Sequence, residues 1–311
     1  MRKNLLIGAV TNYVWDDIAP FFNSYMQAGF ENCECVMFTG NMSKHAISKM
    51  RSYGVNVQPI PEEIMMSDRI AHYRFKLYYD FISERRSDYD MVLAADVRDI
   101  IFQRDLFKLC DASKPFIGAA LEDGLIGDDQ QNNTSWILNG YGEEMLNSVK
   151  DKPIICMGTI WGTCNEFLRF ISEITRRLEA GKAAGRKIED QGSGNVILYT
   201  SGIFDDIIKP SSNYDGYVMT IGFNDPQDIH IDSAGNVING KGEIAALFHQ
   251  YNRKPAILDI IAKKYCADMS AFSRAKLKHG CDNFGRVLGF LSRVHRRGLF
   301  RSVLEAVKRR I

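Results

Sequence analysis

The sequence lacks a hydrophobic run long enough to cross a bilayer, which takes roughly 20 apolar residues. At the amino terminus, MRKNLLIGAVTNYVWDD has two basic residues and an apolar run, Leu5–Val10, but Asp16 and Asp17 follow without a small-residue cleavage site. Such a run is too short for a secretory signal and is typical of a first buried strand. We therefore expect neither a membrane span nor a signal peptide.

Paired cysteine spacing is also missing. The seven cysteines, at 33, 35, 110, 156, 164, 266 and 281, form no CxxC motif. Cys33 and Cys35 would share one face of a strand, and could bind a metal only if other ligands joined them. Scattered free cysteines are most often buried structural thiols. The pattern favours a reduced, cytoplasmic protein.

An excess of one charge is absent as well, since 39 Lys and Arg face 38 Asp and Glu. This balance argues against a protein that coats nucleic acid along its whole surface. With 45% hydrophobic and 11% aromatic residues, the 311-residue chain can bury a sizeable core and is not a disordered chain. The length allows one large domain or two smaller ones.

The balance conceals a basic carboxyl-terminal segment. Residues 273–311 hold 11 Lys and Arg and 2 Asp and Glu, which leaves 28 basic and 36 acidic residues elsewhere. Apolar residues recur in this segment at helical spacing, so residues 266–311 are expected to form a basic amphipathic helical tail. An anionic membrane surface is one expected partner, and a helix packed on the body with a solvated basic face is the alternative. No nucleic acid is expected, because no known reading module accompanies the charge.

Strands and helices alternate along the first hundred residues. Apolar runs and helical spacing predict strands at Leu5–Val10, Cys35–Thr39, Val55–Ile60 and Asp90–Ala95, and helices at Ile18–Phe30, Ser43–Tyr53 and Ser67–Arg86. This order predicts an α/β fold in residues 1–265, with a mostly parallel, mixed sheet flanked by helices. Ligands of such sheets bind beyond the carboxyl ends of the strands.

The later part of the chain is less regular. It contains predicted strands at Pro115–Leu121 and Ile154–Trp161, helices at Asn165–Ala180 and from Asp190, a polar loop at 122–134, and a hairpin within 222–242. The hairpin turns are expected at Ala234-Gly235 and Asn239-Gly240.

The clearest chemical feature is a pair of acids after an apolar strand. The segment YDMVLAADVRDIIFQ delivers Asp96 and Asp99 to the end of a strand. Carboxylates there suit Mg²⁺ or Mn²⁺, which bind through one or two carboxylates and substrate phosphates. The alternative is that one acid caps a turn while the other pairs with Arg98. Both acids can reach one ion only if the chain turns at Val97 and Arg98.

These residues resemble a known family. DYDMVLAADVRDIIFQRDLF is similar to the strand-plus-acid signature of nucleotide-sugar-dependent glycosyltransferases of the GT-A fold, especially bacterial polysaccharide and lipopolysaccharide enzymes and retaining family-eight-like ones. Four further segments follow the family order over about residues 3–260: Tyr73-Arg74-Phe75, GTIWG from Gly158, DQGSGN from Asp190, and FHQYNR from Phe248. The usual family motif is Asp-x-Asp, and this chain departs from it with Asp-x-x-Asp.

The resemblance implies a role for each matching residue. It implies a manganese or magnesium site at Asp96, Asp99 and His249, catalytic and donor-sugar contacts from Arg74, Asp190 and Gln191, nucleotide contacts from Thr11, Asn12, Tyr13, Asp96 and Arg253, and an acceptor side at Gly158 and Trp161. Taken alone, His249 is more simply a core histidine, Arg74 a solvated helix charge and Asp190 a helix cap. Trp161 is as readily a core side chain as part of an acceptor site.

The implied activity is metal-dependent transfer of a sugar from a nucleotide-sugar donor, a UDP-sugar first, to a glycan or lipid-linked acceptor of cell-surface polysaccharide synthesis. Retention of anomeric configuration is expected. An inverting enzyme would need a carboxylate base, for which Asp190, Glu122 and Asp123 are candidates. The alternatives are a catalytically silent GT-A-like domain that recruits partners to a membrane, and a sugar nucleotidyltransferase, although the glycine-rich opening of that class is absent. The expected location is cytoplasmic, peripheral on the inner face of the membrane.

Overall fold

The computed structural model describes residues 2–67, 70–223, 229–266, 287 and 291. The helices are α1 (Trp15–Ala28), α2 (Lys44–Ser52), α3 (Glu62–Ser67), α4 (Arg74–Glu84), α5 (Asn133–Tyr141), α6 (Glu143–Val149), α7 (Cys164–Ala183), α8 (Asp190–Thr200) and α9 (Pro255–Tyr265). The strands are β1 (Lys3–Thr11), β2 (Cys33–Gly40), β3 (Asn56–Pro59), β4 (Tyr89–Ala95), β5 (Ile100–Phe102), β6 (Ile117–Leu125), β7 (Pro153–Thr163), β8 (Ile208–Ser211), β9 (Val218–Thr220), β10 (His230–Ile231), β11 (Val237–Ile238) and β12 (Leu247–His249).

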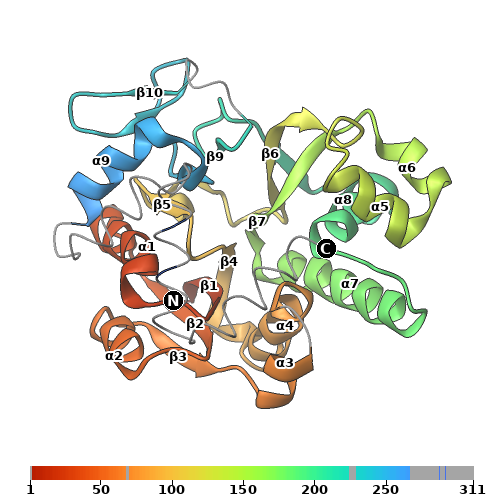
Figure 1. Cartoon of the computed structure of the whole chain (residues 1–311), viewed down its shortest axis with the longest axis horizontal. Coiled ribbons are helices and arrows are strands. Elements are labelled where there is room, and N and C mark those ends of the chain that lie inside the picture. Colours follow the sequence, from red (N-terminus) through yellow and green to blue (C-terminus); the bar gives the residue numbers. More distant parts are fainter. Residues whose placement is uncertain (1, 68–69, 224–228, 267–286, 288–290, 292–311) are drawn as a thin grey trace.

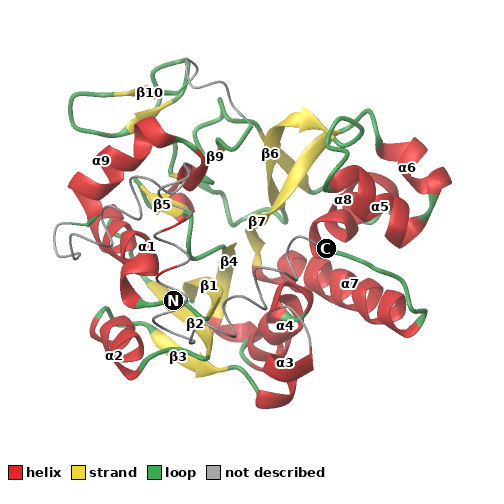
Figure 2. Ribbon diagram, in the orientation of Figure 1, coloured by secondary structure: helices red, strands yellow, loops and turns green. Residues whose placement is uncertain are grey.

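The main sheet has the order β3-β2-β1-β4-β7-β6-β9-β12-β5, and β8 pairs with β6. Strands β3, β2, β1 and β4 are parallel, whereas β7 is antiparallel to both β4 and β6. Strands β6, β9 and β12 run parallel to one another, and β5 is antiparallel to β12. Since β7 is antiparallel to both β4 and β6, strands β4 and β12 run in the same direction and end at the same edge of the sheet. The α/β class and the mostly parallel, mixed sheet are thus confirmed (Figure 2).

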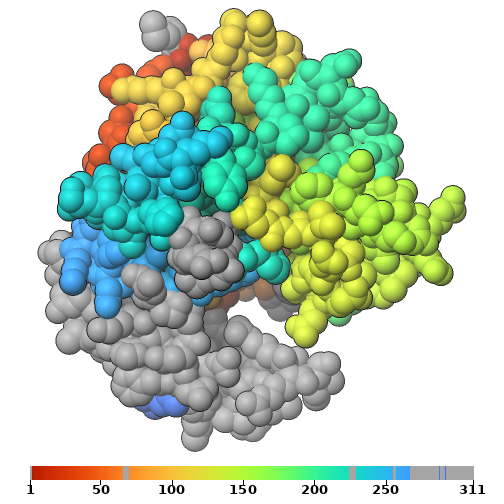
Figure 3. All heavy atoms as spheres, turned by 90° about the horizontal axis from the view of Figure 1, so that it is seen from above, coloured from red at the N-terminus to blue at the C-terminus, as the bar shows by residue number. Residues whose placement is uncertain are grey.

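The central strands are buried on both faces, which is why they read as continuous apolar runs. Leu5 and Ile7 of β1 pack with helices α4 and α7, whereas Leu6 and Val10 pack with α1 and α2. The sheet therefore separates two apolar layers, each closed by its own helices (Figure 1). Strands β9 and β12 and helix α9 contribute to a further apolar cluster, and the blue surface of α9 is visible in the view of Figure 3.

Several predicted boundaries are close. Helix α1 ends before Gly29, whose φ of 64° is the left-handed conformation that glycine adopts readily, and α7 covers the helix expected at Asn165–Ala180. The hairpin β10-β11 turns through Ala234 and Gly235, with φ +74° at Gly235. The second turn lies at Asn239, whose carbonyl accepts a hydrogen bond from the N–H of Gly242.

Two predicted elements are wrong. The single helix expected at Ser67–Arg86 is instead α3, the short 3₁₀ helix Ile70–His72 and α4. The break sets Arg74 at the first position of α4, where its side chain turns toward the edge of the sheet. The loop expected at 122–134 belongs partly to β6 and partly to α5, because its polar residues at 122 and 133 are held in buried contacts.

Most of the tail expected at 266–311 lies outside the described residues. Of this tail, the structure describes only Cys266, Val287 and Leu291. Among the residues that are described, none of the helices combines the length and apolar character that a bilayer span needs.

Candidate metal and nucleotide site

Three predicted metal ligands converge at the carboxyl edge of the sheet. Asp96 follows β4, His249 ends β12, and Asp99 precedes β5. Each offers one ligand atom, and the three atoms lie within 4.8 Å of one another. Nε2 of His249 is 3.3 Å from Oδ1 of Asp99 and 3.8 Å from Oδ2 of Asp96. The turn at Val97 and Arg98 thus brings both acids to one point despite the Asp-x-x-Asp spacing.

Gly158 leaves room for this cluster. A Cβ on Gly158 would lie 2.4 Å from Cε1 of His249 and 2.9 Å from Oδ2 of Asp96. The backbone of β7 contacts the cluster, since the carbonyl of Gly158 accepts a hydrogen bond from the N–H of Asp96 at 2.8 Å. Gly158, expected on the acceptor side, therefore lies directly beneath the candidate metal ligands.

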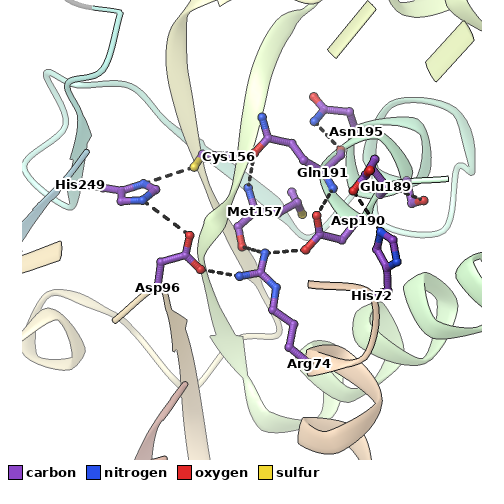
Figure 4. Close-up of polar contacts among 11 residues, drawn as sticks. His72, Arg74, Asp96, Cys156, Met157, Glu189, Asp190, Gln191, Asn195 and His249 are labelled. Carbon is purple, nitrogen blue, oxygen red and sulfur yellow. Dashed lines mark hydrogen bonds and ion pairs between the residues drawn. The ribbon is translucent and has the colours of Figure 1, made fainter. Parts of the chain in front are cut away.

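Arg74 joins the metal-ligand cluster to helix α8 (Figure 4). Its Nη1 donates to Oδ1 of Asp96, and its Nη2 pairs with Oδ2 of Asp190 at 2.7 Å and donates to the carbonyl of Met157 at 3.0 Å. The Arg74 side chain is only 14% exposed. A buried guanidinium between two carboxylates fixes the orientation of both, so Arg74 is not a solvated helix charge.

Asp190 and Gln191 start helix α8 beside this arginine. Asp190 is the first residue of α8, after the N-cap position Glu189, and its Oδ1 accepts from the backbone N–H of Gln191 at 2.8 Å, so it does not cap the helix. Oε1 of Gln191 accepts from the backbone N–H of Met157 at 3.3 Å, and its Nε2 donates to Oδ1 of Asn133 at 3.2 Å. The DQ segment is therefore anchored on β7 and α5.

The cluster opens into a cleft with a cavity volume of about 350 Å³. Ten of the expected site residues line it: Thr11, Tyr13, Arg74, Asp96, Asp99, Gly158, Asp190, Gln191, His249 and Arg253. Three carboxylates, three arginines and one histidine line the cleft. The arginine that was not among the expected site residues is Arg98. A cleft of this size and mixed polarity suits a polar small molecule that carries anionic groups.

Two expected site residues lie elsewhere. Trp161 is 3% exposed, stacks on Tyr217 with ring centroids 6.0 Å apart, and fills the space above Gly118. It is a core side chain, which agrees with the core alternative for this residue rather than with a place on the acceptor side. Asn12 has a φ of 62° and its side chain pairs with Asn41, so it lies beside the cleft-lining residues Thr11 and Tyr13 rather than among them.

The charged groups of the cluster shift one another's pKa values. Burial raises the pKa of Asp96, helped by the neighbouring carboxylates and opposed by Arg74 and His249. Burial also acts to raise the pKa of Asp99, but the charge and hydrogen bond of His249 outweigh it and lower that pKa. Carboxylates that crowd together in a partly buried site gain from a nearby cation.

The donor set fits a divalent cation. Two carboxylate oxygens and one imidazole nitrogen match Mn²⁺, which accepts both ligand types, whereas Mg²⁺ prefers oxygen alone. Oδ1 of Asp96 faces Arg74 while Oδ2 faces His249, so the carboxylate is already oriented toward the cluster. The side chain of Asp96 is 38% exposed, which leaves the cluster open to the cleft.

Three residues in or beside the cleft were not foreseen from the sequence. Trp136 of α5 and Gln250 line the cleft, and Sγ of Cys156 lies 3.4 Å from Nδ1 of His249. Cys156 was expected only as a buried thiol. The signal available in the sequence was its spacing of two residues from Gly158, which places both residues on the same face of β7. Of the candidate bases, Glu122 is 4% exposed, and Asp123 accepts a hydrogen bond from Nδ2 of Asn213 at 3.0 Å.

Models of known protein families give no match to this chain, and no curated protein matches it significantly. The chemistry of the site therefore follows from its own residues.

Proposed function

We propose that this protein is a metal-dependent glycosyltransferase that uses a nucleoside-diphosphate sugar. The observation that carries the proposal is the Asp96, Asp99 and His249 cluster beside a buried arginine, in a cleft at the carboxyl edge of an α/β sheet. The nucleotide part of the donor would lie near Thr11 and Tyr13, which follow the end of β1.

The leaving diphosphate sets the electrostatic demand. A manganese or magnesium ion held by Asp96, Asp99 and His249 would supply positive charge to the diphosphate oxygens. Arg253 and Arg98 line the same cleft and can add further positive charge. Arg74 orients Asp96 and Asp190 and can donate to a polar group of the donor.

The acceptor is proposed to be a glycan or a lipid-linked glycan of cell-surface polysaccharide synthesis, approached from the side of Asp190, Gln191 and Trp136. With retention of configuration, the leaving phosphate can take the acceptor proton and no separate base is required. The protein would then work in the cytoplasm, peripherally on the inner face of the membrane.

The test is a thermal-shift titration of the full chain against UDP-, GDP- and CMP-sugars, with and without MnCl₂. We expect one nucleotide to raise Tm in a manganese-dependent manner. Asp96→Asn should abolish that shift, while Asp151→Asn, at an exposed turn, serves as the matched control. A shift that survives Asp96→Asn contradicts the metal assignment, and no shift with any nucleotide favours the silent domain.

A further inference from the structure

Gln250, the residue after His249, has a backbone conformation that residues other than glycine rarely adopt. Its φ of 65° and ψ of 28° lie in the left-handed region, which is unfavourable for a residue that carries a Cβ. Two backbone hydrogen bonds hold Gln250 there, because its N–H donates to the carbonyl of Asp99 at 2.9 Å and its carbonyl accepts from the N–H of Arg253 at 3.1 Å. The turn sets Gln250 against the cleft, which it lines together with Arg253.

The side-chain amide of Gln250 has a buried oxygen that is not paired. The residue is 5% exposed, and its Oε1 is buried without a hydrogen-bond partner among the residues that the structure describes. Such an acceptor lowers the stability of a fold, since it gives up hydrogen bonds to water and gains none in return. Strained and unpaired groups of this kind gather at ligand-binding sites, where the ligand supplies the missing contact.

Gln103 shows how a purely structural glutamine is held in the same fold. Its Nε2 donates to the carbonyls of Val237 and Ala245 at 2.9 and 3.1 Å, and its Oε1 accepts from the N–H of Val237 at 2.7 Å. The backbone thus uses both ends of the Gln103 amide. Gln250 differs, because its acceptor is used by none of the described residues.

The surroundings of this oxygen indicate which group it would bind. A Cβ on Gly222 would lie 1.7 Å from Oε1 of Gln250 and 2.8 Å from Nη1 of Arg253, so both side chains end against the same glycine. The arginine offers positive charge to a phosphate oxygen, whereas the neutral amide oxygen accepts from a hydroxyl or N–H group. A phosphate with a hydroxyl nearby is found in every sugar phosphate, so the two side chains together fit the sugar-phosphate part of a nucleotide sugar.

We propose that Gln250 is a specificity-determining residue of the nucleotide-sugar site, and that its Oε1 accepts a hydrogen bond from a sugar hydroxyl near the phosphate that Arg253 binds. The proposal rests on the proposed function for the class of ligand. The hydroxyl belongs either to the ribose or to the transferred sugar. Because a ligand without this hydroxyl would leave Oε1 buried and unpaired, the site discriminates against such a ligand.

The first test is isothermal titration calorimetry of the full chain in MnCl₂ with UDP-glucose and with UDP, or with the corresponding pair for the nucleotide that the thermal shift selects. Gln250→Met keeps the length of the side chain and removes the amide, so it should weaken binding of the nucleotide sugar by about 5- to 100-fold. An equal loss for UDP assigns the hydroxyl to the ribose, and an unchanged affinity for UDP assigns it to the transferred sugar. Unchanged affinity for both ligands would overturn the proposal.

The second test compares thermal unfolding of the chain without metal or nucleotide. Gln250→Met removes a buried unpaired amide and should raise Tm, as expected where a residue is kept for binding at the expense of stability. Gln103→Met, the matched control, breaks the hydrogen bonds described above, so it should lower Tm and leave nucleotide affinity unchanged. An equal fall in Tm for the two variants would assign Gln250 a structural role and overturn the proposal.

The two levels of the proposal fail differently. If the wild type binds none of the nucleotides, the proposed function fails and this proposal fails with it. If the wild type binds a nucleotide sugar and Gln250→Met binds it equally well, only the role of Gln250 is wrong.

Discussion

At the scale of single residues, the site depends on the absence of a side chain at 158. Gly158→Ala would place a Cβ 2.4 Å from Cε1 of His249 and 2.9 Å from Oδ2 of Asp96. Because both neighbours would have to move, we expect Mn²⁺ affinity to fall by about 10- to 100-fold, as for other residues that orient metal ligands. Isothermal titration calorimetry measures this change.

The matched control for that substitution is Gly124→Ala. Gly124 also lies in a strand, but a Cβ there would meet only Cδ1 of Ile154, at the ordinary contact distance of 3.6 Å. It should bind Mn²⁺ like the wild type. Equal affinities for Gly158→Ala and Gly124→Ala would contradict the arrangement of the ligands around Gly158.

The two tryptophans near the expected acceptor side offer a second prediction. Trp161→Phe removes buried apolar surface from the core and should destabilise the fold by about 1–3 kcal/mol, because Trp161 stacks on Tyr217 and covers Gly118. If the protein transfers sugar as proposed, the effect of this change on kcat/KM should be small. Urea denaturation and steady-state kinetics measure the two quantities.

Trp136→Phe is the counterpart, since Trp136 lines the cleft. We expect it to change the acceptor KM more than stability. If Trp161→Phe instead raised the acceptor KM while leaving stability intact, the placement of Trp161 in the core would be wrong.

At the scale of elements, Glu34 of β2 joins strands β3 and β4 and the residue that ends helix α4. Its carboxylate accepts hydrogen bonds from Asn56 Nδ2 and Tyr89 Oη, each at 2.9 Å, and from Arg85, whose Nη2 is 3.0 Å away. Burial acts to raise the pKa of Glu34, but these partners outweigh it and lower that pKa. The carboxylate therefore stabilises the fold when it is ionised.

The sign of the pH effect follows from this lowered pKa. The contribution of Glu34 is present above the ordinary glutamate pKa of about 4.3 and is lost as pH falls through the lower folded value. Glu34→Gln should cost about 1–3 kcal/mol at pH 7 and reduce the loss of stability between about pH 5 and pH 3. Urea denaturation at each pH measures both effects.

The control is Glu31→Gln, three residues before Glu34 in the sequence. Glu31 is 74% exposed and pairs with Lys108 at the surface, and such pairs contribute about 0–1 kcal/mol. An acid sensitivity of Glu34→Gln equal to that of wild type would show that Glu34 does not contribute as described.

The same scale separates what the sequence predicts from what it does not. The long strands were predictable, because β1 and β4 are continuous apolar runs buried on both faces. Strands β5, β9 and β12 have three residues each. A run that short shows no periodicity, and its place in the sheet is set by neighbours distant in the sequence.

The candidate site divides in a similar way. That Asp96, Asp99 and His249 lie together was expected from the resemblance, and their convergence requires the turn after β4. The bridge from Arg74 to Asp96 and Asp190 was not, since contacts between three separate elements leave no local pattern. Cys156 was predicted as a buried thiol, but the histidine beside it was not foreseen.

At the scale of the whole molecule, the charge is divided unequally. Residues 273–311 carry 11 basic and 2 acidic residues, and the rest of the chain carries 28 and 36. If the tail binds an anionic membrane, each basic residue contributes about 1 kcal/mol. Replacing Lys308, Arg309 and Arg310 with Gln in the full chain should then weaken binding to phosphatidylserine vesicles by about 100-fold. Vesicle sedimentation measures the effect.

The control replaces three basic residues of helix α2, Lys44, Lys49 and Arg51, with Gln. This variant has the same net charge as the tail variant and should bind vesicles like the wild type. Equal losses in the two variants would assign membrane attraction to net charge rather than to the tail.

The positions of the candidate metal ligands in the sequence also determine when, during synthesis of the chain, the metal site can form. Asp96 and His249 are 153 positions apart, and His249 ends β12, a strand made late in synthesis. A growing chain that stops before this strand has both carboxylates but no imidazole. If an ion binds there, loading must follow nearly complete synthesis. It would then link distant parts of the chain, adding about 2.7 kcal/mol of stability at a free ion concentration of 100 times Kd.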